Sequence, residues 1–332
     1  MLGRAVIVKR NAAKGNGMSK PQVLQMGAYP AWDMPALEAG FAMHRYFEAG
    51  DKAAFLASVG PEVRAIATRG DLGASAAVIA ACPKLEVIAV NGVGYDAVDL
   101  EACRLRGVRV TNTPDVLNGE CADLAVGMAL ALTRGLVGGE AWARSGDWAG
   151  QGPYPLQRRF WGQRAGILGL GRIGMEVGKR LAGFGMQISY LALGPKVTPE
   201  WQFVADPVEL ARGVDFLFVT ALANASTRHI VSRAVIEALG PEGMLINISR
   251  AANVDEGALL DALESGALGS AALDVFEGEP KVNPRFAALK NVLMQPHVGS
   301  ATVETRVAMG KLMLDNLVAH FAGRPLLTEV VL

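Results

Sequence analysis

Three side chains that could move a proton or bind an anion stand near the ends of predicted strands. Arg250 follows the apolar run 244–248, Glu279 follows the apolar run 271–275, and His297 lies at a predicted strand-to-helix break. Open α/β sheets bind ligands at the carboxyl ends of their strands. A cation, a carboxylate and an imidazole gathered there could bind a substrate carboxylate and tune a general acid. The alternatives are a buried histidine bonded to the backbone and two solvated loop charges.

A glycine-rich turn lies between a predicted strand at 165–168 and a predicted helix at 172–184. Its residues are Gly169, Leu170, Gly171, Arg172, Ile173 and Gly174. The first glycine permits a tight turn, the second lets the backbone approach a pyrophosphate, and the third lets the helix pack closely on the strand. Free N–H groups at the helix N-terminus would hold the anion. The motif predicts dinucleotide binding, with a structural turn or S-adenosylmethionine binding as alternatives.

The segment that usually distinguishes NAD from NADP contains no acidic residue. In NAD-binding proteins a carboxylate about 20 positions beyond the fingerprint bonds the adenosine ribose. The matching stretch, 189–196, holds no Asp or Glu and ends at Lys196. Lys196 could reach a 2′-phosphate, or it could simply be solvated. We therefore expect NADP(H) to be preferred, with NAD(H) possible.

Alternating strands and helices must position these groups. The first predicted strands lie at 21–26, 64–68, 85–90 and 108–111. A long helix is predicted at 118–136, and the later strands lie at 165–168, 187–191, 215–220, 244–248 and 271–275. A final amphipathic helix is predicted at 302–321. This alternation predicts an α/β protein with two series of parallel βαβ units.

Composition narrows the class of protein. The 332 residues are 51% apolar and 19% charged, a balance typical of a folded chain long enough for two domains. Basic and acidic residues number 32 each, so no electrostatic footprint for nucleic acid is present. The longest apolar runs are about half of the roughly 20 residues that a membrane span needs. We expect no nucleic-acid or membrane partner.

The minor features of the sequence favour a cytoplasmic protein. Three cysteines without a C-x-x-C pair indicate neither a disulfide scaffold nor a metal site. Residues 1–17 hold basic but no acidic residues and lack the apolar core of a secretory signal. They are interpreted as an N-terminal extension, with a transit peptide as the alternative. Apart from His297, the histidines are expected to be solvated, His44 and His320 on surface helices and His229 in a loop.

Several motifs in a fixed order resemble the D-isomer-specific 2-hydroxyacid dehydrogenases. Besides the glycine fingerprint they are NGVGYD at 91–96, TNTPDV at 111–116, NISR at 247–250, LDVF at 273–276 and PHVGS at 296–300. The chain is most similar to the hydroxypyruvate/glyoxylate and hydroxyphenylpyruvate reductase branch. The resemblance runs from about residue 64 to residue 306, and the ordered set is far more specific than any single motif.

The resemblance implies two Rossmann-like, doubly wound parallel-sheet domains, with the cofactor domain inserted into a smaller flavodoxin-like substrate domain. The substrate domain would comprise 18–114 and 301–332, and the NAD(P)-binding domain 115–300. Pro114 and Gly299 would act as hinges. Trp142 and Trp148 lie in the segment that forms a dimer arm in relatives, which implies a homodimer. Ordinary core packing is the alternative for both tryptophans.

The resemblance also assigns roles to the candidate residues. His297 would protonate the carbonyl oxygen as hydride arrives, Glu279 would bond the imidazole and favour its charged form, and Arg250 would grip the keto acid. The substrate would be bound by Asn91, Val93 and Gly94, with backbone N–H groups holding its carboxylate. The cofactor would be bound by Gly169, Gly171, Arg172, Ile173, Gly174, Lys196 and Asp274, the last orienting the nicotinamide amide.

Two departures from the family pattern bear on these roles. The family usually has glycine after the catalytic arginine, whereas this chain has Ala251 and Ala252. If that position needs a positive φ, alanine would strain the loop and shift Arg250. NADP-using relatives often place arginine where this chain has Leu193, so the preference for NADPH should be modest.

The activity expected from the sequence is the NAD(P)H-dependent reduction of a small 2-keto acid. Glyoxylate or hydroxypyruvate would be the substrate, and the product would be the D-2-hydroxy acid. The alternative is a non-catalytic, corepressor-like protein of the same fold that senses dinucleotides. The candidate set Arg250, Glu279 and His297 favours the enzyme.

Overall fold

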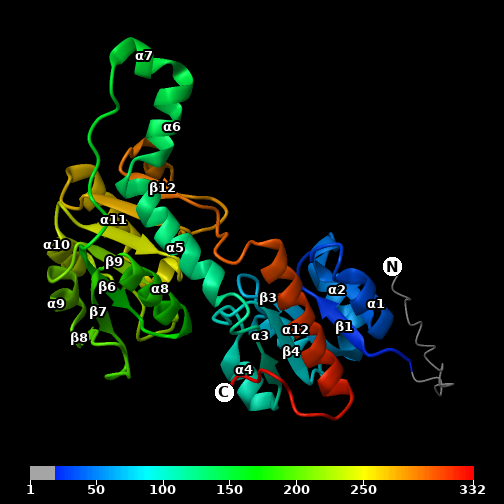
Figure 1. The fold of residues 1–332 in the computed structure, drawn as a ribbon. Coiled ribbons are helices and arrows are strands. Elements are labelled where there is room, and N and C mark those ends of the chain that lie inside the picture. The colour runs from blue at the N-terminus through cyan, green and yellow to red at the C-terminus, as the bar shows by residue number, and fades with distance from the viewer. Residues whose placement is uncertain (1–18) are drawn as a thin grey trace, which may run out of the picture.

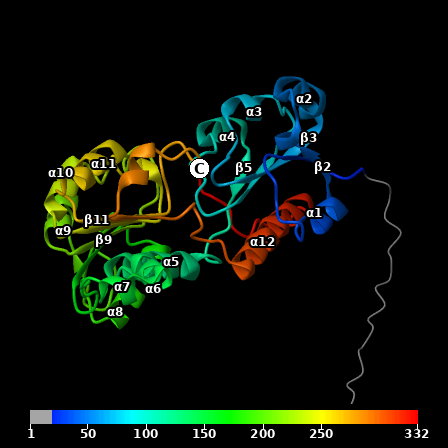
Figure 2. The ribbon, with the colours of Figure 1, turned by 90° about the horizontal axis from the view of Figure 1, so that it is seen from above.

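The chain forms two α/β domains, each built on its own parallel sheet (Figure 1). The structure is a computed structural model, and it describes residues 19–332. The extension predicted at 1–17 lies outside the described residues. In Figure 2 the two domains lie side by side, joined by the chain that enters helix α5 and the chain that enters helix α12.

The smaller domain has a five-stranded sheet of strand order β2-β1-β3-β4-β5, in which every pairing is parallel. Its strands are β1 (Gln22–Gln25), β2 (Ala42–Arg45), β3 (Val63–Arg69), β4 (Val87–Asn91) and β5 (Arg109–Thr111). Its helices are α1 (Met34–Gly40), α2 (Lys52–Val59), α3 (Ala76–Ala80) and α4 (Leu100–Arg106). This strand order is the flavodoxin-like one. Strand β4 is buried along its whole length because helices cover both faces of the sheet.

The larger domain has a seven-stranded parallel sheet of order β12-β11-β10-β9-β6-β7-β8. Its strands are β6 (Arg164–Leu168), β7 (Gln187–Leu191), β8 (Gln202–Phe203), β9 (Phe216–Val219), β10 (Met244–Asn247), β11 (Ser270–Leu273) and β12 (Val292–Met294). Its helices include α8 (Arg172–Gly183), α9 (Pro207–Arg212), α10 (Arg233–Leu239) and α11 (Glu256–Ser265). The order reverses between β6 and β9, which is the switch point where Rossmann folds bind dinucleotides.

Two long helices connect the domains. Helix α5 (Asn118–Thr133) leaves the small sheet and packs on α8 of the larger domain. Helix α12 (Val303–Phe321) returns after β12 and packs on β4 of the small sheet. The predicted architecture of two Rossmann-like domains is thereby confirmed. The exact limits at 18–114, 115–300 and 301–332 stay a prediction.

The long helix predicted at 118–136 ends earlier than expected. It stops at Thr133, and Gly135 adopts a left-handed conformation with φ 59° before a second helix begins. The chain then forms α6 (Leu136–Ser145) and α7 (Asp147–Gln151). Figure 1 shows α6 and α7 projecting from the larger domain as an arm.

The expectations for two histidines were wrong. His44 lies on the edge strand β2, not on a helix, and its Nε2 is 2.6 Å from Oε1 of Gln22. His320 does lie on α12, but its side chain is only 11% exposed and pairs with Glu86 at 2.9 Å. The sequence did not predict strand β2, because two of its four residues are polar and the strand has no clear alternation of apolar and polar residues. The side chain of His320 is largely buried because the last turn of α12 packs on the small sheet.

All three cysteines are free and buried. Burial raises the pKa of the Cys121 thiol to about 12 and the pKa values of the Cys82 and Cys103 thiols to about 11, so all three stay protonated. Within residues 19–332 no single helix has the length and hydropathy of a membrane span, although α5 and α6 pass together as a pair bent by 54°.

Candidate active site

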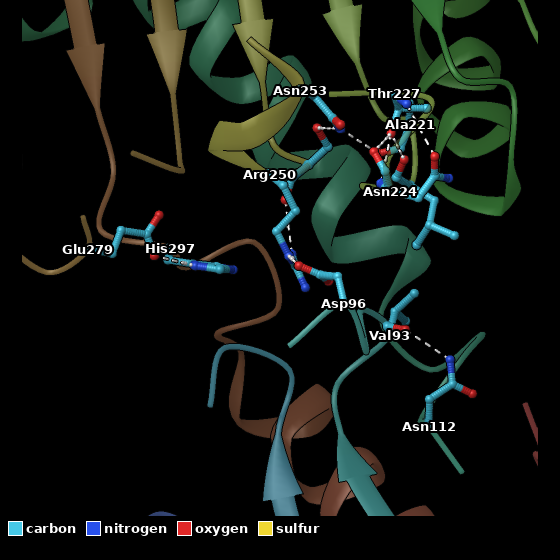
Figure 3. A network of polar contacts seen from close by, with 12 residues as sticks. Val93, Asp96, Asn112, Ala221, Asn224, Thr227, Arg250, Asn253, Glu279 and His297 are labelled. Carbon is cyan, nitrogen blue, oxygen red and sulfur yellow. Dashed lines mark hydrogen bonds and ion pairs between the residues drawn. The ribbon is translucent and has the colours of Figure 1, made fainter. Parts of the chain in front are cut away.

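His297 and Glu279 form a pair in the loops that follow β12 and β11. The imidazole Nδ1 lies 2.8 Å from Oε2 of Glu279, and the other carboxylate oxygen accepts the backbone N–H of Phe276 at 2.7 Å. Both carboxylate oxygens are thus engaged, which fixes the orientation of the ring. With Nδ1 donating to the carboxylate, Nε2 is left for a ligand. Figure 3 shows the imidazole reaching from Glu279 toward Arg250 and Asp96.

The loop that carries His297 is held by Asp274. His297 has a left-handed backbone with φ 56°, an unusual conformation for a residue other than glycine. The next two backbone N–H groups, those of Val298 and Gly299, donate to the two oxygens of Asp274 at 2.8 Å each. Burial raises the pKa of Asp274, while these hydrogen bonds and the nearby His297 oppose the rise. Asp274 therefore fixes the backbone on which the imidazole is mounted.

Arg250 stands on a loop that two asparagines stiffen. The side chain of Asn247 donates to the carbonyl of Arg250 at 3.0 Å and accepts the backbone N–H of Ser249 at 3.0 Å. Asn253 donates to the carbonyl of Ala221 at 2.8 Å and to the Ser249 hydroxyl at 3.0 Å. Both asparagines are buried, so the loop after β10 has a single well-defined shape.

The guanidinium of Arg250 crosses from the larger domain to the smaller one. Its Nε lies 3.2 and 3.3 Å from the two carboxylate oxygens of Asp96, and its Nη1 donates to the carbonyl of Ser249 at 3.0 Å. A Cβ on Gly94 would overlap Nη2 of Arg250 and lie 2.9 Å from Oδ1 of Asp96. Position 94 therefore requires glycine for close approach.

The loop after β4 presents unpaired backbone donors next to this arginine. The carbonyl of Val93 accepts from Asn112 at 2.9 Å, which anchors the loop. The N–H groups of Val93 and Gly94 donate no hydrogen bond to any of the described residues. The Oδ1 of Asn91, buried at the end of β4, likewise has no partner among residues 19–332. Two free N–H groups beside a guanidinium suit an anion.

The glycine fingerprint has the geometry that a dinucleotide needs. Gly169 has φ 105°, and a Cβ there would lie 2.5 Å from Ala221. A Cβ on Gly174 would lie 2.5 Å from the carbonyl oxygen of Gly169, so helix α8 packs directly on the turn. Beside Gly171 the space is open. The residues thus fit a pyrophosphate lying against Gly171 and the N-terminus of α8.

The side chains around the fingerprint differ in the contacts that they make. Arg172 pairs with Asp115 at 3.0 Å, and both side chains are largely exposed. Ile173 is half-buried in the core beneath the turn. Lys196 is exposed and makes no ion pair within residues 19–332, although the Tyr190 hydroxyl bonds its backbone N–H at 2.8 Å.

Two further arginines bring positive charge to this region. Burial opposes ionisation of Asp71, but hydrogen bonds from Arg69 at 3.0 and 2.6 Å outweigh it and lower the pKa of Asp71. Arg306, on the first turns of α12, is half-buried, and burial together with the charge of Arg69 lowers its pKa. The charge of His297 also acts on Asp71, so these groups lie near the candidate site.

The expected strain after Arg250 is absent. Ala251 and Ala252 open a short 3₁₀ turn, Ala251–Asn253, and neither has a positive φ in the described chain. Alanine is therefore tolerated here, and Arg250 keeps an extended backbone at φ −142°. The concern that the missing glycine would displace Arg250 is wrong.

Asp96, Asn247 and Asn253 were not singled out as site residues from the sequence. An asparagine ending an apolar strand, as Asn247 does, is a usable signal, because such residues bond their own loop. Asp96 ends the motif at 91–96, but nothing in that motif indicates its partner, which lies 154 residues away.

Comparisons with known proteins agree with this geometry. A family model described as the NAD binding domain of D-isomer specific 2-hydroxyacid dehydrogenases matches residues 126–299. Hydroxyphenylpyruvate reductase from Plectranthus scutellarioides is 45% identical over 309 residues, which are 93% of this chain and 98% of that protein.

Two solved structures are similar over nearly the whole chain. A 2-hydroxyacid dehydrogenase from Ketogulonicigenium vulgare Y25 is 68% identical, with a TM-score of 0.89 over 95% of this chain and 99% of that one. An NADPH-dependent glyoxylate/hydroxypyruvate reductase from Sinorhizobium meliloti, in complex with NADP and malonate, is 40% identical, with a TM-score of 0.89 over 94% and 97%. The chain belongs to the D-isomer specific 2-hydroxyacid dehydrogenases.

Proposed function

We propose that this enzyme reduces small 2-keto acids of the glyoxylate and hydroxypyruvate type with NAD(P)H and releases the D-2-hydroxy acid. The observation that carries the proposal is that three features face one another between the two domains (Figure 3). They are the His297–Glu279 pair, the guanidinium of Arg250, and the free N–H groups of Val93 and Gly94. The similar enzyme from Sinorhizobium meliloti is a glyoxylate/hydroxypyruvate reductase, and the one from Plectranthus scutellarioides is a hydroxyphenylpyruvate reductase.

The proposed roles follow from these contacts. Arg250 and the N–H groups at 93–94 bind the carboxylate of the keto acid, and Asn91 adds an acceptor nearby. When bound, the nicotinamide would supply the hydride that reduces the carbonyl carbon. His297 donates the proton at Nε2 to the carbonyl oxygen, and Glu279 stabilises the protonated imidazole through Nδ1. The proton and the hydride together account for the two hydrogens of the hydroxy acid.

For the cofactor, the proposed ligands are the fingerprint residues and their neighbours. The backbone at Gly169, Gly171, Ile173 and Gly174 would hold the pyrophosphate, and Arg172, which pairs with Asp115 here, would add a positive charge beside it. Asp274 keeps a free lone pair on each oxygen after accepting from Val298 and Gly299, which leaves it able to accept from the nicotinamide amide.

A modest preference for NADPH is part of the proposal. No carboxylate stands between Ala192 and Lys196 to repel a 2′-phosphate, and the Lys196 backbone is fixed by Tyr190. Leu193 is fully exposed and offers no guanidinium. The related enzyme from Sinorhizobium meliloti is NADPH-dependent, which supports this preference.

We further propose a cytoplasmic homodimer that uses the arm formed by α6 and α7. On this arm Trp148 is 68% exposed and Val137 65% exposed, whereas Trp142 packs edge-on against Tyr154 and donates to the carbonyl of Gly152. The exposed apolar side chains of the arm suit a second copy of the chain. Equilibrium sedimentation of the wild type and of Trp148→Glu tests this, with monomers expected only for the variant.

The test of the proposed activity is a screen of NADPH and NADH against glyoxylate, hydroxypyruvate and 4-hydroxyphenylpyruvate. Oxidation of the cofactor should be measured together with the configuration of the hydroxy acid formed. Turnover to the D-product supports the proposal. Tight binding of NADPH without turnover of any of the three acids would instead support a non-catalytic sensor, which no observation so far favours.

A further inference from the structure

The contact between Asp96 and Arg250 joins the two domains at the candidate site. Asp96 follows β4 of the five-stranded sheet, and Arg250 follows β10 of the seven-stranded sheet (Figure 3). Their side chains are 30% and 25% exposed, so the pair is neither buried nor freely solvated. A pair this exposed contributes little to stability. Its placement therefore calls for another explanation.

The contact with Asp96 leaves most of the N–H donors of the Arg250 guanidinium free. A guanidinium has five N–H donors in a rigid plane. Asp96 takes the single donor on Nε, and the carbonyl of Ser249 takes one donor on Nη1. One donor on Nη1 and both donors on Nη2 remain, and Nη2 lies against Gly94. Asp96 thus occupies only Nε and leaves both donors of Nη2 free for a substrate.

This arrangement argues against Asp96 as a stand-in for the substrate carboxylate. A stand-in would occupy Nη2, because that group lies against Gly94, whose own N–H group is free. Asp96 occupies Nε instead, and Gly94 leaves room for both side chains. The contact and the free donors are compatible, so a substrate need not displace Asp96.

We propose that Asp96 is a positioning residue for Arg250. Its carboxylate orients the guanidinium across the domain boundary so that Nη2, with both of its donors free, lies at the substrate site beside Gly94. Asp96 touches neither substrate nor cofactor and acts only through Arg250. The inference rests on the proposed role of Arg250 in binding the keto acid.

The test compares Asp96→Ala and Asp96→Asn with the wild-type enzyme. For Asp96→Ala we expect kcat/KM for glyoxylate to fall by about 10- to 100-fold, because a misplaced binding group can cost that much. Asp96→Asn should fall less, since its amide oxygen still accepts from Nε but carries no charge. The KM for NADPH should not change in either variant.

Two controls separate positioning from a general structural effect. Glu329→Gln removes the carboxylate from the surface pair that Glu329 forms with Arg109 at 2.6 Å, and it should leave all kinetic constants unchanged. In the double variant Asp96→Ala, Arg250→Lys, kcat/KM should equal that of Arg250→Lys alone, because lysine has no Nε edge for Asp96 to hold.

The outcomes distinguish this inference from the proposed function. If the wild type reduces no 2-keto acid, the proposed function fails. If it does, and Arg250→Lys is impaired while Asp96→Ala is not, only the role of Asp96 is overturned. Effects of the two substitutions that multiply, or a parallel loss of NADPH binding in Asp96→Ala and Asp96→Asn, would also overturn it.

Discussion

The two ion pairs of the candidate active site differ in where their partners come from. His297 and Glu279 both belong to loops of the seven-stranded sheet, so the pair is complete within one domain. Arg250 and Asp96 belong to different sheets, so their contact exists only when the domains are correctly placed. The proton donor His297 is therefore oriented within one domain. The orientation of Arg250, which we propose to bind the substrate, depends on how the two domains are placed. Changes to the first pair should alter chemistry, and changes to the second should alter substrate binding.

The largest effect should come from His297→Ala. Loss of a general acid lowers kcat by roughly 10²–10⁴-fold. NADPH affinity should stay the same, because the imidazole reaches toward Arg250, the proposed ligand of the substrate (Figure 3). Steady-state kinetics and a fluorescence titration with NADPH measure the two quantities. His44→Ala, at a histidine on the distant strand β2, is the matched control. A kcat reduced only slightly in His297→Ala would remove the residue from the mechanism.

The substitution Gly94→Ala tests the position of Arg250 at the boundary between the domains. The added Cβ would overlap Nη2 of Arg250, so the guanidinium must move. We expect kcat/KM for glyoxylate to fall by about 10²-fold, mainly through KM. The matched control is Gly127→Ala, where nothing lies within 4 Å of the new Cβ. Equal kinetics for the two variants would show that Arg250 does not need its observed position.

A smaller effect is expected from Glu279→Gln, and it should appear in kcat. The carboxylate 2.8 Å from Nδ1 orients the imidazole and stabilises its positive charge before the proton is transferred from Nε2. The amide oxygen of glutamine still accepts a hydrogen bond from Nδ1 but carries no charge, so we expect kcat for glyoxylate to fall by about 10-fold. The KM for NADPH should stay the same. A kcat equal to that of the wild type would mean that the pair does not assist the proton transfer.

The smallest effect concerns the choice of cofactor. One charge-assisted hydrogen bond from Lys196 to a 2′-phosphate contributes about 1.5–3 kcal/mol when it is shielded from water. Lys196 is exposed, so its contribution should be smaller. Lys196→Ala should lower kcat/KM for NADPH but not for NADH, and Ala192→Asp should reverse the preference. A strong preference of the wild type for NADH, or no response to Ala192→Asp, would show that this loop does not bind the phosphate.

The sequence predicted those parts that depend on short-range patterns. The turn from β6 to α8 and the buried strands β9 and β10 followed from apolar runs with glycine beside them. The edge strands β8 and β12 were missed because two or three half-exposed residues carry no clear period. Contacts formed between the domains were the hardest to foresee, because no local pattern links Asp96 to Arg250.

The central claim is that a complete proton donor and a domain-crossing arginine serve the same 2-keto acid. The most direct measurement is a single turnover of hydroxypyruvate with prebound NADPH, followed in the wild type, His297→Ala and Gly94→Ala. We expect D-glycerate from the wild type. In His297→Ala we expect a slow turnover even at saturating hydroxypyruvate, and in Gly94→Ala a turnover that recovers as the concentration of hydroxypyruvate is raised. Two variants with the same dependence on hydroxypyruvate, or a wild type that binds NADPH but forms no D-glycerate, would contradict it.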